Sequence, residues 1–234
     1  IMIKKIIAIL LITAFAISIS FATVGCSKEP LLIVYLGDSI AEGIAGISPV
    51  SEREKNAYYG IVGIRNEYEF RNRSVSGHQT KDMLEIIKRE DTDVKMIRTL
   101  LTSADIIHVS ILGNDLLLED LGQLIISVAN DDYEFLDTIL DNSSKNFTEI
   151  VQTLRGYNPK ATLMFQTVYN PVFTDCDLIS AATRIVLDDM DIREAEFRTY
   201  GAIILDRLNA IISDYLAANP GAYYIIDANA EFER

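Results

Sequence analysis

The sequence predicts an α/β fold, a five-stranded parallel sheet with helices on both faces. Short apolar runs alternate with longer helical patterns from residue 31 onward, an order typical of strands joined by helical crossovers. The chain has 234 residues, of which 49% are hydrophobic and 24% charged. This composition is typical of one globular domain and not of a disordered or disulfide-stapled chain.

Five apolar runs are predicted as strands. Residues 31–36 and 106–112 are almost continuously apolar, as expected for strands that are buried on both faces. Residues 162–167 and 223–226 are similar to them. Residues 69–75 are more polar, so this run is predicted to lie at an edge of the sheet.

Two helices between the strands are clear from the spacing of their apolar residues. The first, over residues 191–218, is predicted to bury one stripe and to stop at the Asn-Pro-Gly sequence that follows it. The stripe consists of Phe197, Tyr200, Ile204, Leu208, Ile211 and Tyr215. The second helix, over residues 146–154, is predicted to bury Phe147, Ile150, Val151 and Leu154.

The first residues have the order of a secretory signal. Lys4 and Lys5 precede an uncharged apolar stretch over residues 6–24, and Gly25 and Cys26 follow it. A cysteine directly after a small residue resembles the lipobox of bacterial lipoproteins. The resemblance implies that the cysteine becomes the acylated first residue of a membrane-anchored mature protein.

The match to the lipobox is loose, because Thr23 stands where that pattern usually has leucine. The alternative is an uncleaved membrane anchor, since the apolar stretch is long enough to span a bilayer. Residues 1–25 are therefore predicted as a signal peptide or membrane anchor and residues 26–30 as a tether. In either case we expect the body, residues 31–234, to lie outside the cytoplasm, anchored to the membrane or secreted.

Charge and histidine content exclude two classes of partner. The net charge of -13 disfavours nucleic acid, because phosphate binding needs a basic surface. The acidic clusters at residues 131–132 and 188–191 lack the alternating ligands and central glycine of a calcium loop. His78 and His108 are the only histidines, and neither has a partner at zinc-ligand spacing. We therefore expect no metal.

Three turns that follow predicted strands carry chemically useful residues. Ligands of open parallel sheets bind outside the carboxyl ends of the strands, where all three turns would meet. The turns are Gly37-Asp38-Ser39, Ser76-Gly77-His78 and Gly113-Asn114-Asp115. The N–H groups of Ser39 and Gly77 and the side-chain amide of Asn114 would give three donors around one point, as an acyl-transfer oxyanion requires.

These turns resemble three motif blocks of the SGNH or GDSL hydrolases. Gly37-Asp38-Ser39 with Gly43 resembles the first block, residues 72–77 the second and Gly113-Asn114-Asp115 the third. The resemblance covers the whole body and implies a three-layer, flavodoxin-like α/β/α fold. It also implies an esterase or lipase without cofactors, which acts through an acyl-serine at Ser39. Asp38 and Asp115 are expected to form hydrogen bonds that support the turns.

The family's fourth block, an Asp and a His separated by two residues after the last strand, is missing. In that family the His is the general base for the serine and the Asp orients it. We expect this base to be encoded beyond Arg234, so that the chain alone has weak or no turnover. His78 would belong to the oxyanion loop and His108 to the core, and Asp227 is expected to cap the last strand. The alternative is a ligand-binding protein or inactive remnant of the family.

Apolar residues near the three turns are candidates for the substrate pocket. They are Ile40, Leu116 and Tyr169, with Leu117 and residues 170–173 close by. They suit an acyl chain, and ordinary core packing is the alternative. Lipids, acetylated polysaccharides and small esters all remain open as substrates.

Overall fold

The computed structural model describes residues 29–44, 52–89, 92–171 and 178–234. The chain divides into two units, Ile1–Pro30 and Leu31–Arg234. The predicted signal or anchor over residues 1–25 and most of the tether lie outside the described residues. Among the helices that the structure describes, none is long and apolar enough to cross a bilayer.

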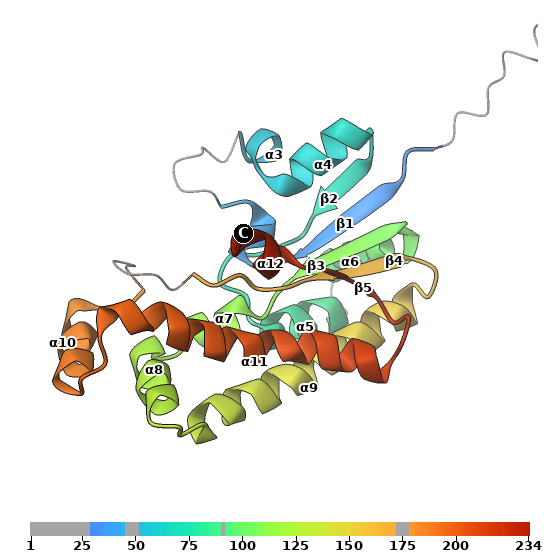
Figure 1. Ribbon diagram of the computed structural model, residues 1–234. Coiled ribbons are helices and arrows are strands. Elements are labelled where there is room, and N and C mark those ends of the chain that lie inside the picture. Colours follow the sequence, from blue (N-terminus) through green and yellow to red (C-terminus); the bar gives the residue numbers. More distant parts are fainter. Residues whose placement is uncertain (1–28, 45–51, 90–91, 172–177) are drawn as a thin grey trace, which may run out of the picture. The chain divides into compact units, whose positions relative to one another are not determined.

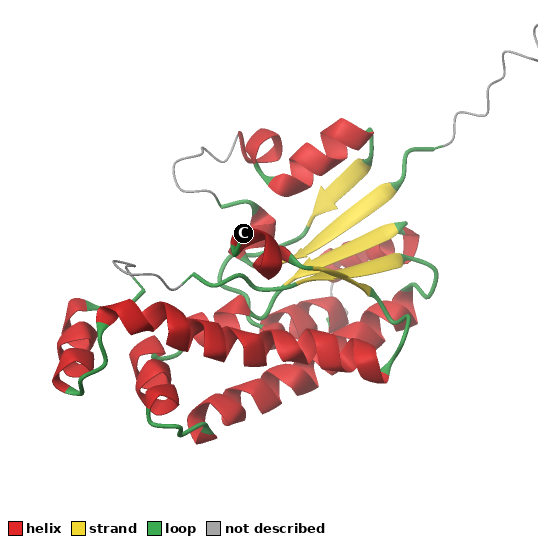
Figure 2. Ribbon diagram, in the orientation of Figure 1, coloured by secondary structure: helices red, strands yellow, loops and turns green. Residues whose placement is uncertain are grey.

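The second unit is built on a five-stranded parallel sheet in the order β2-β1-β3-β4-β5, shown in yellow in Figure 2. All five predicted strands are confirmed, and the polar one is at an edge as predicted. Their bounds are Leu32–Gly37 (β1), Glu69–Asn72 (β2), Ile106–Ser110 (β3), Thr162–Gln166 (β4) and Tyr224–Ile226 (β5). β3 ends two residues earlier than predicted, and the buried Leu112 just after it has a φ of 94°.

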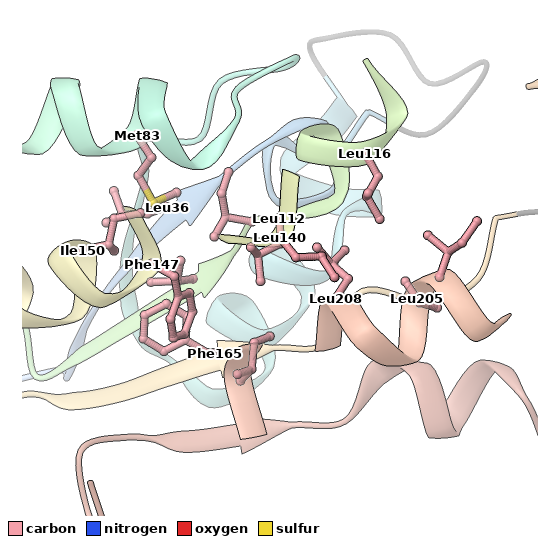
Figure 3. Packing of buried hydrophobic residues seen from close by; sticks show 14 of the residues in the cluster. Leu36, Met83, Leu112, Leu116, Leu140, Phe147, Ile150, Phe165, Leu205 and Leu208 are labelled. Atoms are coloured by element: carbon pink, nitrogen blue, oxygen red, sulfur yellow. The ribbon is translucent and has the colours of Figure 1, made fainter. Parts of the chain in front are cut away.

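One face of the sheet is covered by most of the helices, of which α5, α9 and α11 are seen below the strands in Figure 1. The helices on this face are α5 (Thr80–Lys88), α6 (Thr92–Ser103), α7 (Gly113–Leu117), α8 (Leu121–Ala129), α9 (Glu134–Tyr157) and α11 (Phe197–Ala218). α10 (Ala181–Asp189) packs on α8. Their apolar faces and the inward side chains of β1, β3 and β4 form the main core, part of which is drawn in Figure 3.

The opposite face carries fewer helices. α3 (Arg53–Asn56) and α4 (Tyr58–Asn66) lie here, and Ala57 and Tyr59 pack against Ile33 and Tyr35 of β1 in a second, smaller core. α12 (Ala228–Phe232) follows β5. Helices therefore lie on both faces of the sheet, and the predicted three-layer α/β/α fold is confirmed.

Three details of the helices differ from the predictions. α11 begins at Phe197 and not at residue 191, because Asp191 has a left-handed backbone with a φ of 60° and residues Glu194–Glu196 form a short 3-10 helix before α11. Its fully buried residues include Gly201 and Leu205, whereas Tyr200, Ile211 and Tyr215 of the predicted stripe are only partly buried. The predicted helix over residues 146–154 is the middle of the longer α9, with all four expected residues buried.

The sequence predicts that Asp227 caps the last strand, but in the structure it caps a helix instead. Its carboxylate accepts a hydrogen bond from the Ala230 N–H at 3.1 Å and so forms the N-cap of α12. The hydroxyl of Thr167, just after β4, also donates to this carboxylate. The interaction joins the carboxyl ends of β4 and β5.

Candidate active site

The turn after β1 places Ser39 at the carboxyl end of the sheet. Asp38 is the N-cap of α2 (Ser39–Glu42), and its carboxylate accepts a hydrogen bond from the Ile40 N–H at 2.9 Å. Ser39 is thereby the first residue of a four-residue helix. A helix of one turn has a weak dipole, so the local hydrogen-bond donors matter more for a developing charge than the helix dipole does.

The turn depends on the missing side chain of Gly37. A Cβ at this position would lie 2.2 Å from the carbonyl oxygen of Ser110 and 2.7 Å from the Cβ of Ala41. We expect Gly37→Ala to lower the free energy of unfolding by about 3 kcal/mol, since the nearby backbone of β3 cannot move away without disrupting the sheet. Urea denaturation measures the effect. Gly156→Ala is the control, because nothing lies within 4 Å of a Cβ at that exposed position.

Two further contacts hold the segment after β2 against α2. The side-chain amide of Asn72 donates to the carbonyl oxygen of Ala41 at 2.6 Å. The carboxylate of Glu42 accepts from the Ser76 N–H at 2.7 Å and forms an ion pair with Arg53. The segment that leads to Gly77 is thus fixed to the helix that begins with Ser39.

Asn114 holds the next part of this segment through a reciprocal pair of hydrogen bonds. Its side-chain amide donates to the His78 carbonyl oxygen at 3.0 Å, and the Gln79 side-chain amide donates to the Asn114 carbonyl oxygen at 3.2 Å. Since an amide nitrogen has two protons, the Asn114 side chain still has a second N–H to offer. We call this pair of interactions the Asn114–Gln79 clasp.

Asp115 supports the clasp from inside the protein. Its buried carboxylate accepts hydrogen bonds from the N–H and the hydroxyl of Thr80, at 3.0 and 2.6 Å, and from the hydroxyl of Ser143 at 3.0 Å. Burial raises the pKa of Asp115, while the hydrogen bonds from Thr80 and Ser143 oppose that shift. The carboxylate joins the starts of α5 and α7 to α9.

Ser39 and Asn114 line one cavity at the carboxyl ends of β1, β3 and β4. Asp38, Ile40 and Tyr169 also line it, whereas Leu116 lines a neighbouring cavity and Asp115 lies behind the wall. Gly77 is exposed and is not part of the described lining. The structure therefore brings Ser39 and Asn114 together and ties the segment of Gly77 to Asn114.

The polar groups of Ser39 are available to a ligand. Within the described ranges, neither its N–H nor its hydroxyl has a hydrogen-bond partner, and the same holds for the N–H of Gly77. The unpaired N–H and hydroxyl of Ser39, which lines the cavity, can bind an anion or a carbonyl oxygen. Among the described residues, no group of three or more His, Cys, Asp or Glu side chains is arranged to hold a metal ion.

Asp38 directly precedes Ser39 and has a buried carboxyl group. Only 5% of the residue is exposed, and burial raises its pKa to about 6, although hydrogen bonds from backbone N–H groups partly oppose this. Gly113 lies close to the carboxyl group, since a Cβ there would be 3.7 Å from its Oδ2. Asp38 is therefore ionised near pH 7 and becomes protonated under mildly acidic conditions.

The raised pKa predicts a pH-dependent contribution to stability. The folded protein binds the Asp38 proton more tightly than the unfolded chain, whose carboxyl has the ordinary pKa of 3.8. The stabilisation is therefore complete below about pH 4 and is lost as the pH rises through about 6. We expect Asp38→Asn, which keeps an acceptor for Ile40, to gain about 3 kcal/mol at most relative to the wild type between pH 4 and pH 7. Urea titrations across this range measure it, and a constant difference would contradict the prediction.

The two histidines do not approach Ser39 through any hydrogen bond that the described residues make. His108 is buried in β3, where its Nδ1 lies 3.4 Å from the Tyr58 hydroxyl, and burial lowers its pKa to about 4. It is the core residue that the sequence indicates. His78 contributes its backbone carbonyl to the Asn114–Gln79 clasp.

Sequence reasoning missed the residues that position the predicted ones. Gln79 and Thr80 directly follow the second turn, Ser143 is a buried hydroxyl on α9, and Asn209 on α11 binds the backbone of Val168. The sequence signal that could have found some of them is a polar residue on the side of a helix that the apolar pattern predicts to be buried. Their partners are fixed only by the tertiary structure.

Sequence comparisons give one relative of unknown role. No family model matches the chain. The uncharacterized protein YpmR of Bacillus subtilis (strain 168) is 26% identical over 179 residues, which is 74% of this chain and 64% of YpmR. The match thus spans less than two thirds of that relative's length.

Several solved structures have the same fold as this chain. Phospholipase A1 from Streptomyces albidoflavus NA297 superimposes with a TM-score of 0.58 at 20% identity, over 87% of this chain and 82% of that one. The lipase Lip_vut3 from a goat rumen metagenome gives a TM-score of 0.57 at 17% identity, over 87% and 83% of the two chains. This chain has the fold of these lipases. An extracellular lipase from Streptomyces rimosus, with a TM-score of 0.57 and 16% identity over 87% and 82%, agrees.

Proposed function

We propose that the protein is a serine ester hydrolase of the SGNH or GDSL type with Ser39 as its nucleophile. The observation that carries this proposal is the cavity at the carboxyl end of the sheet. Ser39 and Asn114, which are far apart in the sequence, both line it, and Ser39 has an unpaired hydroxyl and N–H within the described part of the chain. The shared fold with lipases supports the same class of reaction.

The reaction follows from these groups. A general base takes the proton of the Ser39 hydroxyl as its oxygen attacks the ester carbonyl carbon, and the electron pair of the carbonyl bond moves to the carbonyl oxygen. The resulting oxyanion accepts hydrogen bonds from the Ser39 N–H and the second N–H of the Asn114 side chain, with the Gly77 N–H as the proposed third donor. The intermediate collapses as the bond from its carbon to the alkoxy oxygen breaks, and that oxygen receives the proton from the general base, so the alcohol leaves and an acyl-serine remains. Water, deprotonated by the same base, then hydrolyses the acyl-serine to the acid and free Ser39.

Asp38 and Asp115 keep the donors in place in this proposal. Asp38 caps the helix that begins with Ser39. Asp115 fixes the start of α5 next to α7, and with it the Asn114–Gln79 clasp.

We propose no metal or organic cofactor. We also propose that residues 1–25 direct the protein out of the cytoplasm or anchor it in the membrane, where lipid, polysaccharide or small esters are its substrates.

Covalent labelling with a fluorophosphonate tests the proposal on the full natural protein. We expect one phosphonate adduct, which mass spectrometry of peptides locates on Ser39. Ser39→Ala should abolish the adduct, and Ser110→Ala should keep it, because Ser110 lines the same cavity but has no proposed role. An adduct that persists in Ser39→Ala, or no adduct in the folded wild type, would contradict the assignment.

A ligand-binding protein without catalysis is the second candidate. It is favoured by one observation: no side chain in the described ranges hydrogen-bonds the Ser39 hydroxyl as a general base would. This candidate predicts that esters bind in the cavity and are recovered intact. Chromatography of the ester after prolonged incubation with the protein separates the two functions.

A further inference from the structure

We propose that Glu42 is a positioning residue, whose carboxylate holds the turn over residues 75–78 in the form that aims the Gly77 N–H at the oxyanion. The inference rests on the proposed ester hydrolysis and adds to it the residue that keeps the third donor in place. Glu42 is not part of the described lining of the Ser39 cavity, so it acts through the turn and not on the substrate.

Residues 75–78 form a β-turn of type II. The His78 N–H donates a hydrogen bond to the Val75 carbonyl oxygen at 3.2 Å, and Gly77, the third residue of the turn, has a φ of 82°. Ser76, the second residue, is not among the described residues with a positive φ. A type II turn requires a positive φ at its third residue, whereas a type I turn has a negative φ there.

The direction of the Gly77 N–H depends on which type of turn forms. The peptide between Ser76 and Gly77 carries this N–H, and it is rotated by roughly 150° between type I and type II turns. Glycine adopts negative and positive φ about equally well, so Gly77 permits type II without selecting it. The turn residues Ser76 and Gly77 are exposed, so packing does not select it either. Contacts of the neighbouring groups must therefore do so.

Hydrogen bonds fix the chain on both sides of this peptide. Before it, the Ser76 N–H donates to the Glu42 carboxylate at 2.7 Å. After it, the His78 carbonyl oxygen accepts from the Asn114 side-chain amide at 3.0 Å. The Gly77 N–H lies between these two anchors and has no hydrogen-bond partner within the described ranges. Glu42 is thus the anchor that the proposed oxyanion donors do not themselves supply.

Glu42 is suited to this role by its place in the chain. It is the last residue of α2, the helix that begins with Ser39, so one turn of helix joins the nucleophile to the anchor. Its other carboxylate oxygen forms an ion pair at 2.5 Å with Arg53 of α3, the helix labelled above the strands in Figure 1. Both side chains are partly buried, so water competes less for the pair. The ion pair keeps the carboxylate from turning away from Ser76.

Two substitutions of Glu42 in the full natural protein test this role. Glu42→Ala removes the acceptor of the Ser76 N–H, so kcat for p-nitrophenyl octanoate should fall at least about tenfold while KM changes by less than about threefold. Glu42→Gln keeps a carbonyl oxygen that can accept the same hydrogen bond, so its kcat should stay within about fivefold of the wild type. A Gln variant as slow as the Ala variant would overturn the proposal, because the hydrogen bond to Ser76 would then not matter.

Glu196→Ala is the matched control. The carboxylate of Glu196 likewise accepts from a backbone N–H and an arginine side chain, both of Arg193, at 3.0 and 3.2 Å. Glu196 lies outside the described lining of the Ser39 cavity, so its loss should leave kcat within about threefold of the wild type. Equal losses in Glu42→Ala and Glu196→Ala would overturn the proposal.

Gly77→Ala perturbs the same turn without a clash, because nothing lies within 4 Å of a Cβ at this position. Alanine rarely adopts a positive φ, so the turn should leave type II and kcat should fall at least about tenfold. Gly221→Ala is its control, with a φ of 83° and the same open space, and should keep kcat within about threefold of the wild type.

The double variant decides whether Glu42 acts through the turn. If it does, adding Glu42→Ala to Gly77→Ala should lower kcat by no more than about threefold further, because the N–H is already misdirected. Losses that multiply in the double variant would show that Glu42 acts independently of Gly77 and would overturn the proposal.

The orientation of the Gly77 N–H can be measured without turnover, by its residual dipolar coupling in the isotope-labelled full natural protein. The coupling should change in Glu42→Ala and in Gly77→Ala and should match the wild type in Glu42→Gln and Glu196→Ala. An unchanged coupling in Glu42→Ala overturns the positioning role even if the wild type is active. If Ser39 does not react with a fluorophosphonate while the coupling changes as expected, the hydrolysis fails and Glu42 still positions the N–H.

Discussion

Ser39→Ala is expected to lower kcat for p-nitrophenyl octanoate by about 10³-fold or more, with KM changed by less than about threefold. The substitution removes the attacking oxygen and prevents the acyl-serine. It leaves the Ser39 N–H and the Asn114 side-chain amide in the cavity, so the ester still binds and water attacks it slowly. Steady-state release of p-nitrophenol by the full natural protein and the variant gives both constants.

Ser110→Ala is the control for this measurement. Ser110 lies at the end of β3 and lines the same cavity, so the control removes one hydroxyl group from the same place. We expect its kcat to stay within about threefold of the wild type. Equal losses in the two variants would show that cavity polarity, and not a nucleophile at residue 39, determines the rate.

The sheet was predictable because its strands are buried in different ways. β1 and β3 lie in the middle of the sheet, and their nearly continuous apolar sequences reflect burial on both faces. β2 lies at an edge and its polar residues alternate with half-buried ones. Burial is thus reflected in the local sequences of β1, β2 and β3, which is why one edge of the sheet could be inferred. The other edge could not, because β5 has an apolar sequence although Tyr224 and Ile226 are exposed.

The boundaries of α11 were less predictable because tertiary packing determines them. A periodic pattern indicates a buried face, but α11 contacts both α8 and α9, so Gly201 and Leu205 are buried beside the expected stripe. No pattern of apolar residues reveals the left-handed backbone of Asp191, a conformation that aspartate tolerates better than most residues.

The site likewise has some contacts that the sequence predicts and others that it does not. Ser39 and Asn114 could be placed together because each follows a strand whose carboxyl end meets the other's in a parallel sheet. The contact between Asp115 and Ser143 and the contact between Asn209 and Val168 could not be inferred, since each joins elements whose distance depends on the packing of whole helices. The apolar cavity beside the Ser39 cavity could not be inferred either, because residues of α7, α8 and α11 line it together.

Asn114→Ala is expected to lower kcat by about 10²- to 10³-fold, the effect of removing one donor from an oxyanion site. The donor acts mainly on the charge that develops in the transition state, so KM should change much less than kcat. The same p-nitrophenyl octanoate assay measures it. The substitution also removes the hydrogen bond to His78, so a change in the segment around Gly77 has to be separated from the loss of the donor.

Gln79→Ala makes that separation. It breaks the other half of the Asn114–Gln79 clasp, in which Gln79 donates to the Asn114 carbonyl oxygen, and it leaves the Asn114 side-chain amide intact. If Asn114 acts by donating to the oxyanion, Gln79→Ala should lower kcat by less than about tenfold. Equal losses in the two variants would mean that Asn114 only docks the segment of Gly77, and the oxyanion site would then have to be built from other donors.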